Sequence, residues 1–114
     1  MTLSEDEIRE RYRALALDWA AAKGEPKKAN RIFKEHHGLY REIRDLELGC
    51  RVIESLLDDP EPSVRLLAAT HALPFASARA EAVLRDLERG NGLYAMDAKY
   101  TLINFRTGRL NLEW

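Results

Sequence analysis

The stretch LLDDPEPSVRLLAATHALPF, residues 56–75, decides the fold. Two prolines stand among acidic residues, and a run that is apolar on almost every side follows them. Pro60 and Pro62 restrict the residues before them to extended backbone, so a helix is expected to end near Asp58. Pro62 also suits the first turn of a new helix over 62–73. Because that helix is apolar all round, we expect other helices to cover it on more than one side.

Apolar residues recur every three or four positions on both sides of this stretch, which is typical of amphipathic helices. At the start, Ser4 and Glu7 are spaced as a capping box, and Leu3 is placed to pack on Ile8 as a hydrophobic staple. No stretch shows a convincing strand pattern. The sequence predicts an all-α fold with six helices in three antiparallel hairpins, at about 4–23, 26–47, 49–58, 62–73, 77–89 and 93–107.

Three local features qualify that assignment. The second helix is expected to run through Gly38, with a break at 37–38 as the alternative. Gly90-Asn91-Gly92 is read as a helix break, and the tail 109–114 as an extended segment over the core. The last helix carries an apolar stripe that we expect to face inward, formed by Leu93, Met96, Tyr100 and Ile103.

Composition sets the class of protein. A chain of 114 residues with 46% hydrophobic and 32% charged residues is expected to form one folded domain over 1–114 rather than a disordered chain. A net charge of −1 does not favour nucleic acid or an anionic membrane as the partner. The single cysteine, Cys50, suits a reducing compartment, and the start of the chain lacks a signal-peptide pattern, so we expect a cytoplasmic protein.

The segment 63–73 lines up with 93–103 at an offset of 30 residues, which indicates a helical repeat. LLDDPEPSVRLLAATHAL resembles a HEAT repeat, a unit of α-α superhelices. The resemblance implies that Asp59 and Arg65 form a structural ladder between adjacent repeats. The second copy departs from the pattern, because Ala95 stands where an arginine is expected and no aspartate-proline turn precedes it.

From about Tyr12 to Leu112 the chain also resembles a small bacterial family with a HEAT-like α-α superhelix and no known function. KKANRIFKEHHGLYREIR, PEPSVRLLAATHALPF and DAKYTLINFRTGRL carry this resemblance. Some relatives are associated with polymorphic toxin systems. The resemblance therefore implies a HEAT-like fold and makes an immunity protein plausible.

No pattern specifies catalysis, a metal or a cofactor, so we expect none of the three. His36 and His37 are adjacent on a helix and point about 100° apart, so they do not suit one metal ion, and His37 lies off the apolar stripe. We interpret His36 and His71 as structural residues of the core. Cys50 is interpreted as a small buried hydrophobe because no base is indicated beside it.

The leading hypothesis is a protein-binding module, in its most specific form an immunity protein that neutralises a cognate toxin by binding it. A nucleic-acid-binding or glycosylase-like protein is the first alternative, because basic residues collect in 26–47, although acids are interspersed there. A self-associating scaffold is the second. Candidate partner-binding residues lie on the polar faces of the second, fourth and sixth helices: Arg31, Glu35, Glu42, Thr70, Asp97 and Asn104.

Overall fold

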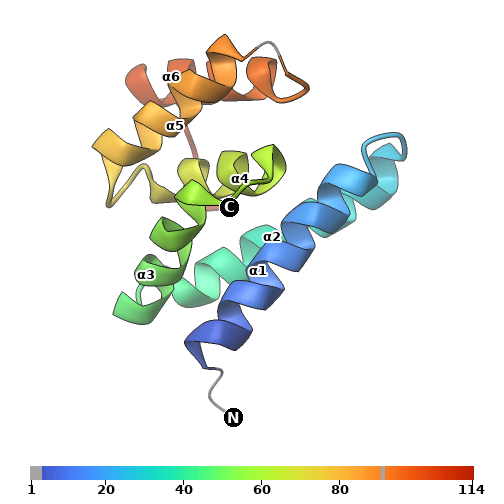
Figure 1. The fold of residues 1–114 in the computed structure, drawn as a ribbon, viewed down its shortest axis with the longest axis vertical. Coiled ribbons are helices and arrows are strands. Elements are labelled where there is room, and N and C mark those ends of the chain that lie inside the picture. Colours follow the sequence, from blue (N-terminus) through green and yellow to red (C-terminus); the bar gives the residue numbers. More distant parts are fainter. Residues whose placement is uncertain (1–3, 91) are drawn as a thin grey trace. The chain divides into compact units, whose positions relative to one another are not determined.

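The structure is a computed structural model that describes residues 4–90 and 92–114. In these residues it contains six α-helices and no strand, so the predicted all-α fold is confirmed. None of the described helices is both long enough and apolar enough to span a membrane. The elements, shown in Figure 1, are α1 Glu5–Ala21, α2 Pro26–Ile43, α3 Glu47–Ser55, the 3₁₀ helix η1 Leu56–Asp58, α4 Pro62–Ala72, α5 Ser77–Arg89 and α6 Ala95–Arg106.

The chain divides after Val52 into two compact units, which are described separately. The first holds α1, α2 and most of α3. The second holds the end of α3 and all later elements. The expectation of one domain over 1–114 stays a prediction.

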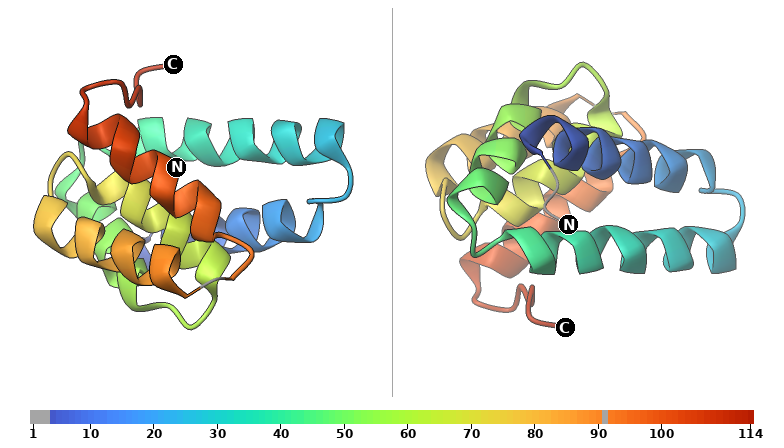
Figure 2. Two further views of the ribbon diagram at one scale, coloured as in Figure 1. Left: turned by 90° about the horizontal axis from the view of Figure 1, so that it is seen from above. Right: turned by 90° about the horizontal axis from the view of Figure 1, so that it is seen from below.

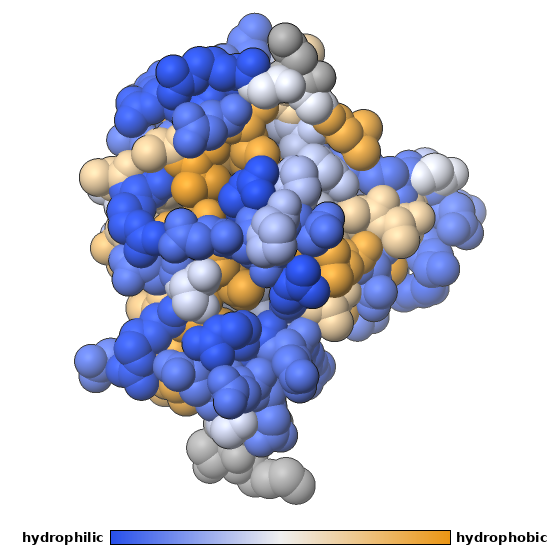
Figure 3. Space-filling model, in the orientation of Figure 1, coloured by the Kyte–Doolittle hydropathy of each residue, from blue (hydrophilic) through white to orange (hydrophobic). Residues whose placement is uncertain are grey.

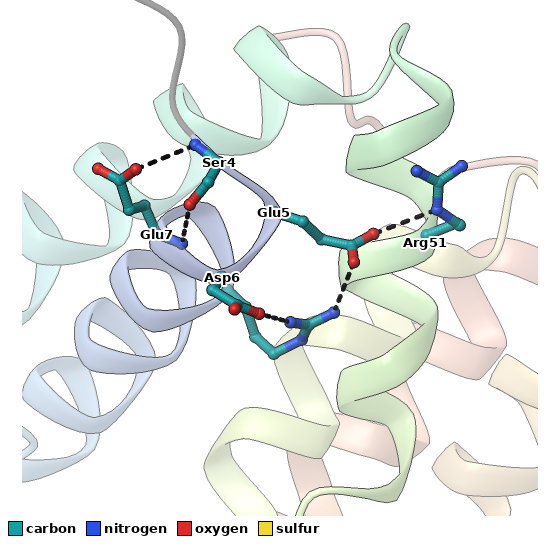
Figure 4. Close-up of polar contacts among 6 residues, drawn as sticks. Ser4, Glu5, Asp6, Glu7 and Arg51 are labelled. Atoms are coloured by element: carbon teal, nitrogen blue, oxygen red, sulfur yellow. Dashed lines mark hydrogen bonds and ion pairs between the residues drawn. The ribbon is translucent and has the colours of Figure 1, made fainter.

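In the first unit, α1 and α2 form a hairpin and lie side by side (Figures 1 and 2). Helix α1 begins with the predicted capping box: the Ser4 Oγ accepts from the Glu7 N–H at 3.1 Å, and the Glu7 Oε1 accepts from the Ser4 N–H at 3.2 Å (Figure 4). These two hydrogen bonds satisfy the backbone N–H groups of Ser4 and Glu7, which have no partner within the helix. Leu3, the expected staple partner of Ile8, lies outside the described residues.

Charged side chains connect α1 to α3 within this unit. The Arg51 Nε donates to the Glu5 Oε1 at 3.1 Å, and Arg9 bonds to the Asp6 carboxylate at 2.9 Å on α1 itself (Figure 4). These side chains are 31–92% exposed, so each pair contributes about 0–1 kcal/mol. These ion pairs therefore contribute less to the stability of the first unit than its buried apolar side chains do.

Helix α2 runs without a break through Gly38, as predicted, but it ends at Ile43 rather than near residue 47. A turn follows, in which the Leu46 N–H donates to the Ile43 carbonyl, and α3 begins at Glu47. Gly49, expected as a separator, lies inside α3. A Cβ at Gly49 would collide with the carbonyl of Ile43, so only glycine allows this close corner.

In the second unit, the acid-proline turn separates η1 from α4 at the predicted place. The Asp59 Oδ1 accepts from the Glu61 N–H at 2.9 Å, and Pro62 is in the first turn of α4. As predicted, α4 is buried on nearly every side, and it packs against η1, α5 and α6. Helices α5 and α6 form a second hairpin (Figures 1 and 2). Helix α6 ends at Arg106, and Gly108, which follows its C-cap, has a φ of 73° that favours glycine.

Two glycines offer a matched test of the α2–α3 corner. A Cβ at Gly38 would meet no atom within 4 Å, so we expect Gly38→Ala to raise the free energy of unfolding by about 0.5–1 kcal/mol. Gly49→Ala is expected to lower it by about 1–3 kcal/mol, because the new methyl group collides with Ile43. Urea denaturation measures both. A neutral Gly49→Ala variant would show that the corner is built differently.

A buried histidine makes the first unit sensitive to acid. His36 is 1% exposed, and its ring centroid lies 4.1 Å from that of Tyr12. Burial, with a smaller contribution from neighbouring His37, lowers the pKa of His36 from its ordinary 6.5 to about 3, although a hydrogen bond with the Tyr12 backbone acts against this. His36 is therefore neutral in the folded protein at neutral pH, whereas in the unfolded chain it takes up a proton below about pH 6.5.

The unfolded state consequently binds one more proton than the folded state between pH 6.5 and about 3. The contribution of neutral His36 to the free energy of unfolding is fully present above pH 6.5. It falls by about 1.4 kcal/mol per pH unit as the pH decreases from 6.5 towards 3. Comparing urea denaturation at pH 7 and pH 5, we expect the wild type to lose about 2 kcal/mol more than His36→Gln. Equal losses in the two proteins would exclude His36 as the source.

Candidate protein-binding surface

Four large apolar side chains on α6 and just before it are exposed to solvent. The exposed fractions are 72% for Leu93, 58% for Met96, 55% for Tyr100 and 41% for Ile103. Their three-four spacing predicts an inward-facing stripe, and that prediction is wrong. Hydrophobic side chains also reach the surface in patches on the face drawn in Figure 3. We refer to the set Leu93, Met96, Tyr100 and Ile103 as the α6 outer face.

The 30-residue repeat explains the error. The buried residues of α6 and its N-cap are Tyr94, Ala98 and Leu102. They correspond to Val64, Ala68 and Ala72 in α4, and these three α4 residues are 0% exposed. Three residues of the α6 outer face correspond to α4 residues that are also buried, namely Ser63, Leu66 and Leu73. Helix α6 therefore repeats α4, but a side that is covered in α4 lies open in α6. Because both sides of α4 are buried, the alignment does not show which side of α6 faces the core, and the three-four spacing selected the outer one.

Two of the six predicted partner-binding residues border the α6 outer face. Asp97 directly follows Met96, Asn104 lies about one turn after Tyr100, and both are partly buried. The Asp97 carbonyl accepts from the Thr101 hydroxyl at 2.8 Å. The Asn104 carbonyl accepts from the N–H groups of residues 109 and 110 at 2.7 and 3.0 Å, which fixes the start of the tail. Their role in binding stays a prediction.

The other four predicted residues are distributed over both units. Arg31, Glu35 and Glu42 are exposed on α2 in the first unit. Thr70 is partly buried on α4 in the second unit, and its hydroxyl donates to the Leu66 carbonyl at 2.8 Å. Because Thr70 satisfies its hydroxyl within its own helix, it offers less for recognition than the exposed charges on α2.

Asp59 and Arg65, the expected ladder residues, meet through the main chain. The Arg65 Nη1 donates to the Asp59 carbonyl at 2.8 Å and to the Pro60 carbonyl at 3.1 Å. The Asp59 carboxylate accepts from the Glu61 N–H in the same turn. In this second unit the arginine therefore braces the turn that precedes its own helix.

A pocket of about 270 Å³ lies beside this brace, within the second unit. Arg65 contributes to it from α4, Leu87 from the last turn of α5, and Leu93 and Tyr94 from the segment before α6. Tyr94 is 8% exposed, and burial raises the pKa of its phenol, with nearby Asp97 and Glu61 acting in the same direction and a hydrogen bond with Ser63 opposing them. The phenol is therefore protonated at neutral pH. The sequence does not reveal this pocket, because its walls come from three separate segments.

The histidines and the cysteine lie in packed surroundings. His71 is 4% exposed in α4, and His37, which was expected to lie off the apolar stripe, is 2% exposed and packs its ring 5.5 Å from that of Tyr40. The Cys50 thiol is partly buried and donates to the Arg44 carbonyl at 3.4 Å. Across residues 4–90 and 92–114, no group of three or more His, Cys, Asp or Glu side chains is arranged to hold a metal ion.

The orientation of α6 can be tested by stability alone. Leu102 is 1% exposed, so Leu102→Ala is expected to lower the free energy of unfolding by about 2–5 kcal/mol. Met96→Gln and Tyr100→Gln replace exposed residues and are expected to change it by less than about 0.5 kcal/mol. Thermal and urea denaturation measure these differences. If Met96→Gln were as destabilising as Leu102→Ala, the outer and inner faces would be interchanged.

Comparison with known proteins adds information on the fold. No protein-family model matches the chain, and no curated protein matches it. Among solved structures, the crystal structure of the protein RPA1889 from Rhodopseudomonas palustris CGA009 is similar, with a TM-score of 0.86 over 96% of this chain and 94% of that chain. The two sequences are 19% identical. The chain thus shares its all-helical fold with a bacterial protein, and the similarity concerns the fold alone.

Proposed function

We propose that this chain is a protein-binding module that uses the α6 outer face to bind an amphipathic helix of a partner protein. The observation that carries the proposal is the exposure of Leu93, Met96, Tyr100 and Ile103, which are 41–72% accessible. Isolated apolar residues on a surface need no explanation, but a contiguous stripe of large ones on one helix is typical of an interaction site. Tyrosine and methionine are also among the residues enriched in protein interfaces.

The repeat supports a helix as the bound element. Positions in α4 that correspond to three residues of the α6 outer face are buried, and α4 packs against other helices of its unit. A surface with the same spacing of apolar residues accommodates a further helix in the same way, because side chains three and four residues apart form the ridges into which a neighbouring helix packs. The partner helix would supply the cover that α6 lacks.

Charge favours an acidic partner over a second copy of this chain. Residues 93–109 contain three basic residues, Lys99, Arg106 and Arg109, and one acidic residue, Asp97. Lys99 and Arg109 are exposed, whereas Arg106 lies 3.6 Å from the Glu81 carboxylate. Symmetric pairing of two α6 outer faces would bring this positive excess against itself. A helix with acidic residues beside its apolar stripe would instead be complementary.

Within this proposal, the finer version is an immunity protein whose partner is a toxin domain. Its support is the resemblance of three segments to bacterial relatives associated with toxin systems, together with the exposed surface for a protein partner. The version predicts that a neighbouring gene encodes a toxin whose product is neutralised by this chain. Co-expression should restore growth with the wild type and fail to do so with the Met96→Gln/Tyr100→Gln variant. Equal rescue by both proteins would contradict it.

The general proposal is tested by site-specific photo-crosslinking followed by reconstitution. A photoreactive benzoylphenylalanine in place of Tyr100 should cross-link to one protein in the native host, and the same group in place of Arg85, exposed on α5, should not. The cross-linked protein, once purified, should bind the wild type. The double variant Met96→Gln/Tyr100→Gln should bind about 100-fold or more weakly, because two apolar side chains lose their burial.

Three results would overturn the proposal. The first is cross-linking that is no stronger at position 100 than at position 85. The second is a purified partner that binds the double variant as tightly as the wild type. The third is a cross-link from position 100 to a second copy of this chain, with a dimer in sedimentation analysis, which would establish self-association in place of partner binding.

A further inference from the structure

The pocket beside Arg65 is large enough to receive a side chain of a partner protein. Its volume is about 270 Å³, below the range of roughly 300–1,000 Å³ typical of sites for small ligands. Leu87, Leu93 and Tyr94 contribute apolar surface, and Pro62 lines it at the start of α4. A pocket of this size and lining has room for a branched apolar group and for a polar group beside it.

Arg65 is the charged group of the pocket that lacks a counter-ion. Its Nη1 donates to the carbonyls of Asp59 and Pro60, and among the described residues it pairs with no carboxylate. Those two bonds hold the guanidinium in place, and the group has five N–H donors in all. The remaining donors are therefore available in a fixed orientation, which reduces the entropy lost when they bind a ligand.

The acidic groups near the pocket do not replace that counter-ion. Asp86 also lines the pocket, but its Oδ1 accepts from the Arg89 Nη2 at 3.2 Å. Glu61 and Asp97 lie close enough to raise the pKa of Tyr94, and the phenol there stays protonated and uncharged. The pocket thus offers a fixed positive group beside apolar walls. This combination suits a carboxylate attached to an apolar group.

Leu93 belongs both to the pocket and to the α6 outer face. A helix packed along Met96 and Tyr100 therefore extends at one end towards Arg65. We infer that the pocket is the anchor site of the partner helix: it receives one branched apolar side chain, and Arg65 binds the carboxylate of an aspartate or glutamate within one turn of that side chain. This inference rests on the proposed function and adds the contact that sets the position of the partner helix along α6.

The first test uses a small probe and the purified chain. 4-Methylpentanoate carries a branched apolar group and a carboxylate, and 4-methylpentanamide has the same shape without the charge. In ¹H–¹⁵N correlation spectra, the pentanoate should shift the amides of Gly90, Gly92 and Leu93 with a Kd on the order of millimolar, as expected for a ligand of about eight heavy atoms. The amide should bind about 10-fold or more weakly, because it cannot form the charged pair with the guanidinium.

Variants identify the residue responsible. Arg65→Gln should weaken pentanoate binding by about 10-fold or more, while Arg85→Gln, which changes an exposed arginine outside the pocket, should leave it unchanged. Because Arg65→Gln also removes the brace of the turn, its fold is checked by thermal denaturation. Leu93→Ala gives an independent result: this side chain is 72% exposed, so the fold is preserved while one apolar wall is lost and binding should weaken.

The second test uses the partner identified by cross-linking. Arg65→Gln should bind that partner about 10-fold or more weakly than the wild type, with Arg85→Gln again unchanged. Absence of pentanoate-induced shifts at the pocket, or equal effects of the two arginine substitutions, would overturn the inference whatever becomes of the proposed function. A partner that needs Met96 and Tyr100 but binds Arg65→Gln as tightly as the wild type would overturn the inference and leave the proposed function in place.

Discussion

The second unit depends on the need to cover a helix that has no polar side. In α4 the residues Val64, Ala68, Ala69 and Ala72 are fully buried, and Leu66, Leu67 and Leu73 are at most 4% exposed. Burying a leucine contributes about 1.5–3 kcal/mol, so leaving any side of this helix in water would be costly. The alanines allow neighbouring helices to approach closely. The positions of η1, α5 and α6 follow from that requirement, because each of them packs against α4.

Most of the fold could be predicted because its signals are local. A capping box marks the start of α1, and prolines mark the starts of α2 and α4, and these signals do not depend on distant residues. The α2–α3 corner could not be predicted in the same way. Its position depends on the close contact between Gly49 and the backbone of Ile43, which forms only after the chain has turned. Apolar spacing continued past Ile43 to Leu46, and Leu46 proves to be 50% exposed.

The candidate site was hidden by the composition of α6. That helix has apolar residues on two sides, and periodicity alone does not show which side faces the core. The inner side carries small residues such as Ala98, because helices that pack closely leave little room, and the outer side carries the larger Met96 and Tyr100. A rule that assigns the largest apolar residues to the core therefore selects the wrong side. Of the predicted polar residues, Asp97 and Asn104 border this face because each directly follows one of its apolar residues, Met96 or Ile103, in the sequence.

The contacts of Arg65 differ from the ladder that the resemblance to a HEAT repeat implies. In the repeat that this segment resembles, such an arginine takes part in a ladder that continues from one unit to the next. Here the equivalent position in α6 is Ala95, so the pattern does not continue, and Arg65 bonds instead to the carbonyls of its own turn. Those bonds engage one of its terminal nitrogens and hold the group beside Leu93. A residue whose usual role is structural is thereby fixed, positively charged and adjacent to an exposed apolar stripe, which are the properties that recognition of an acidic helix requires.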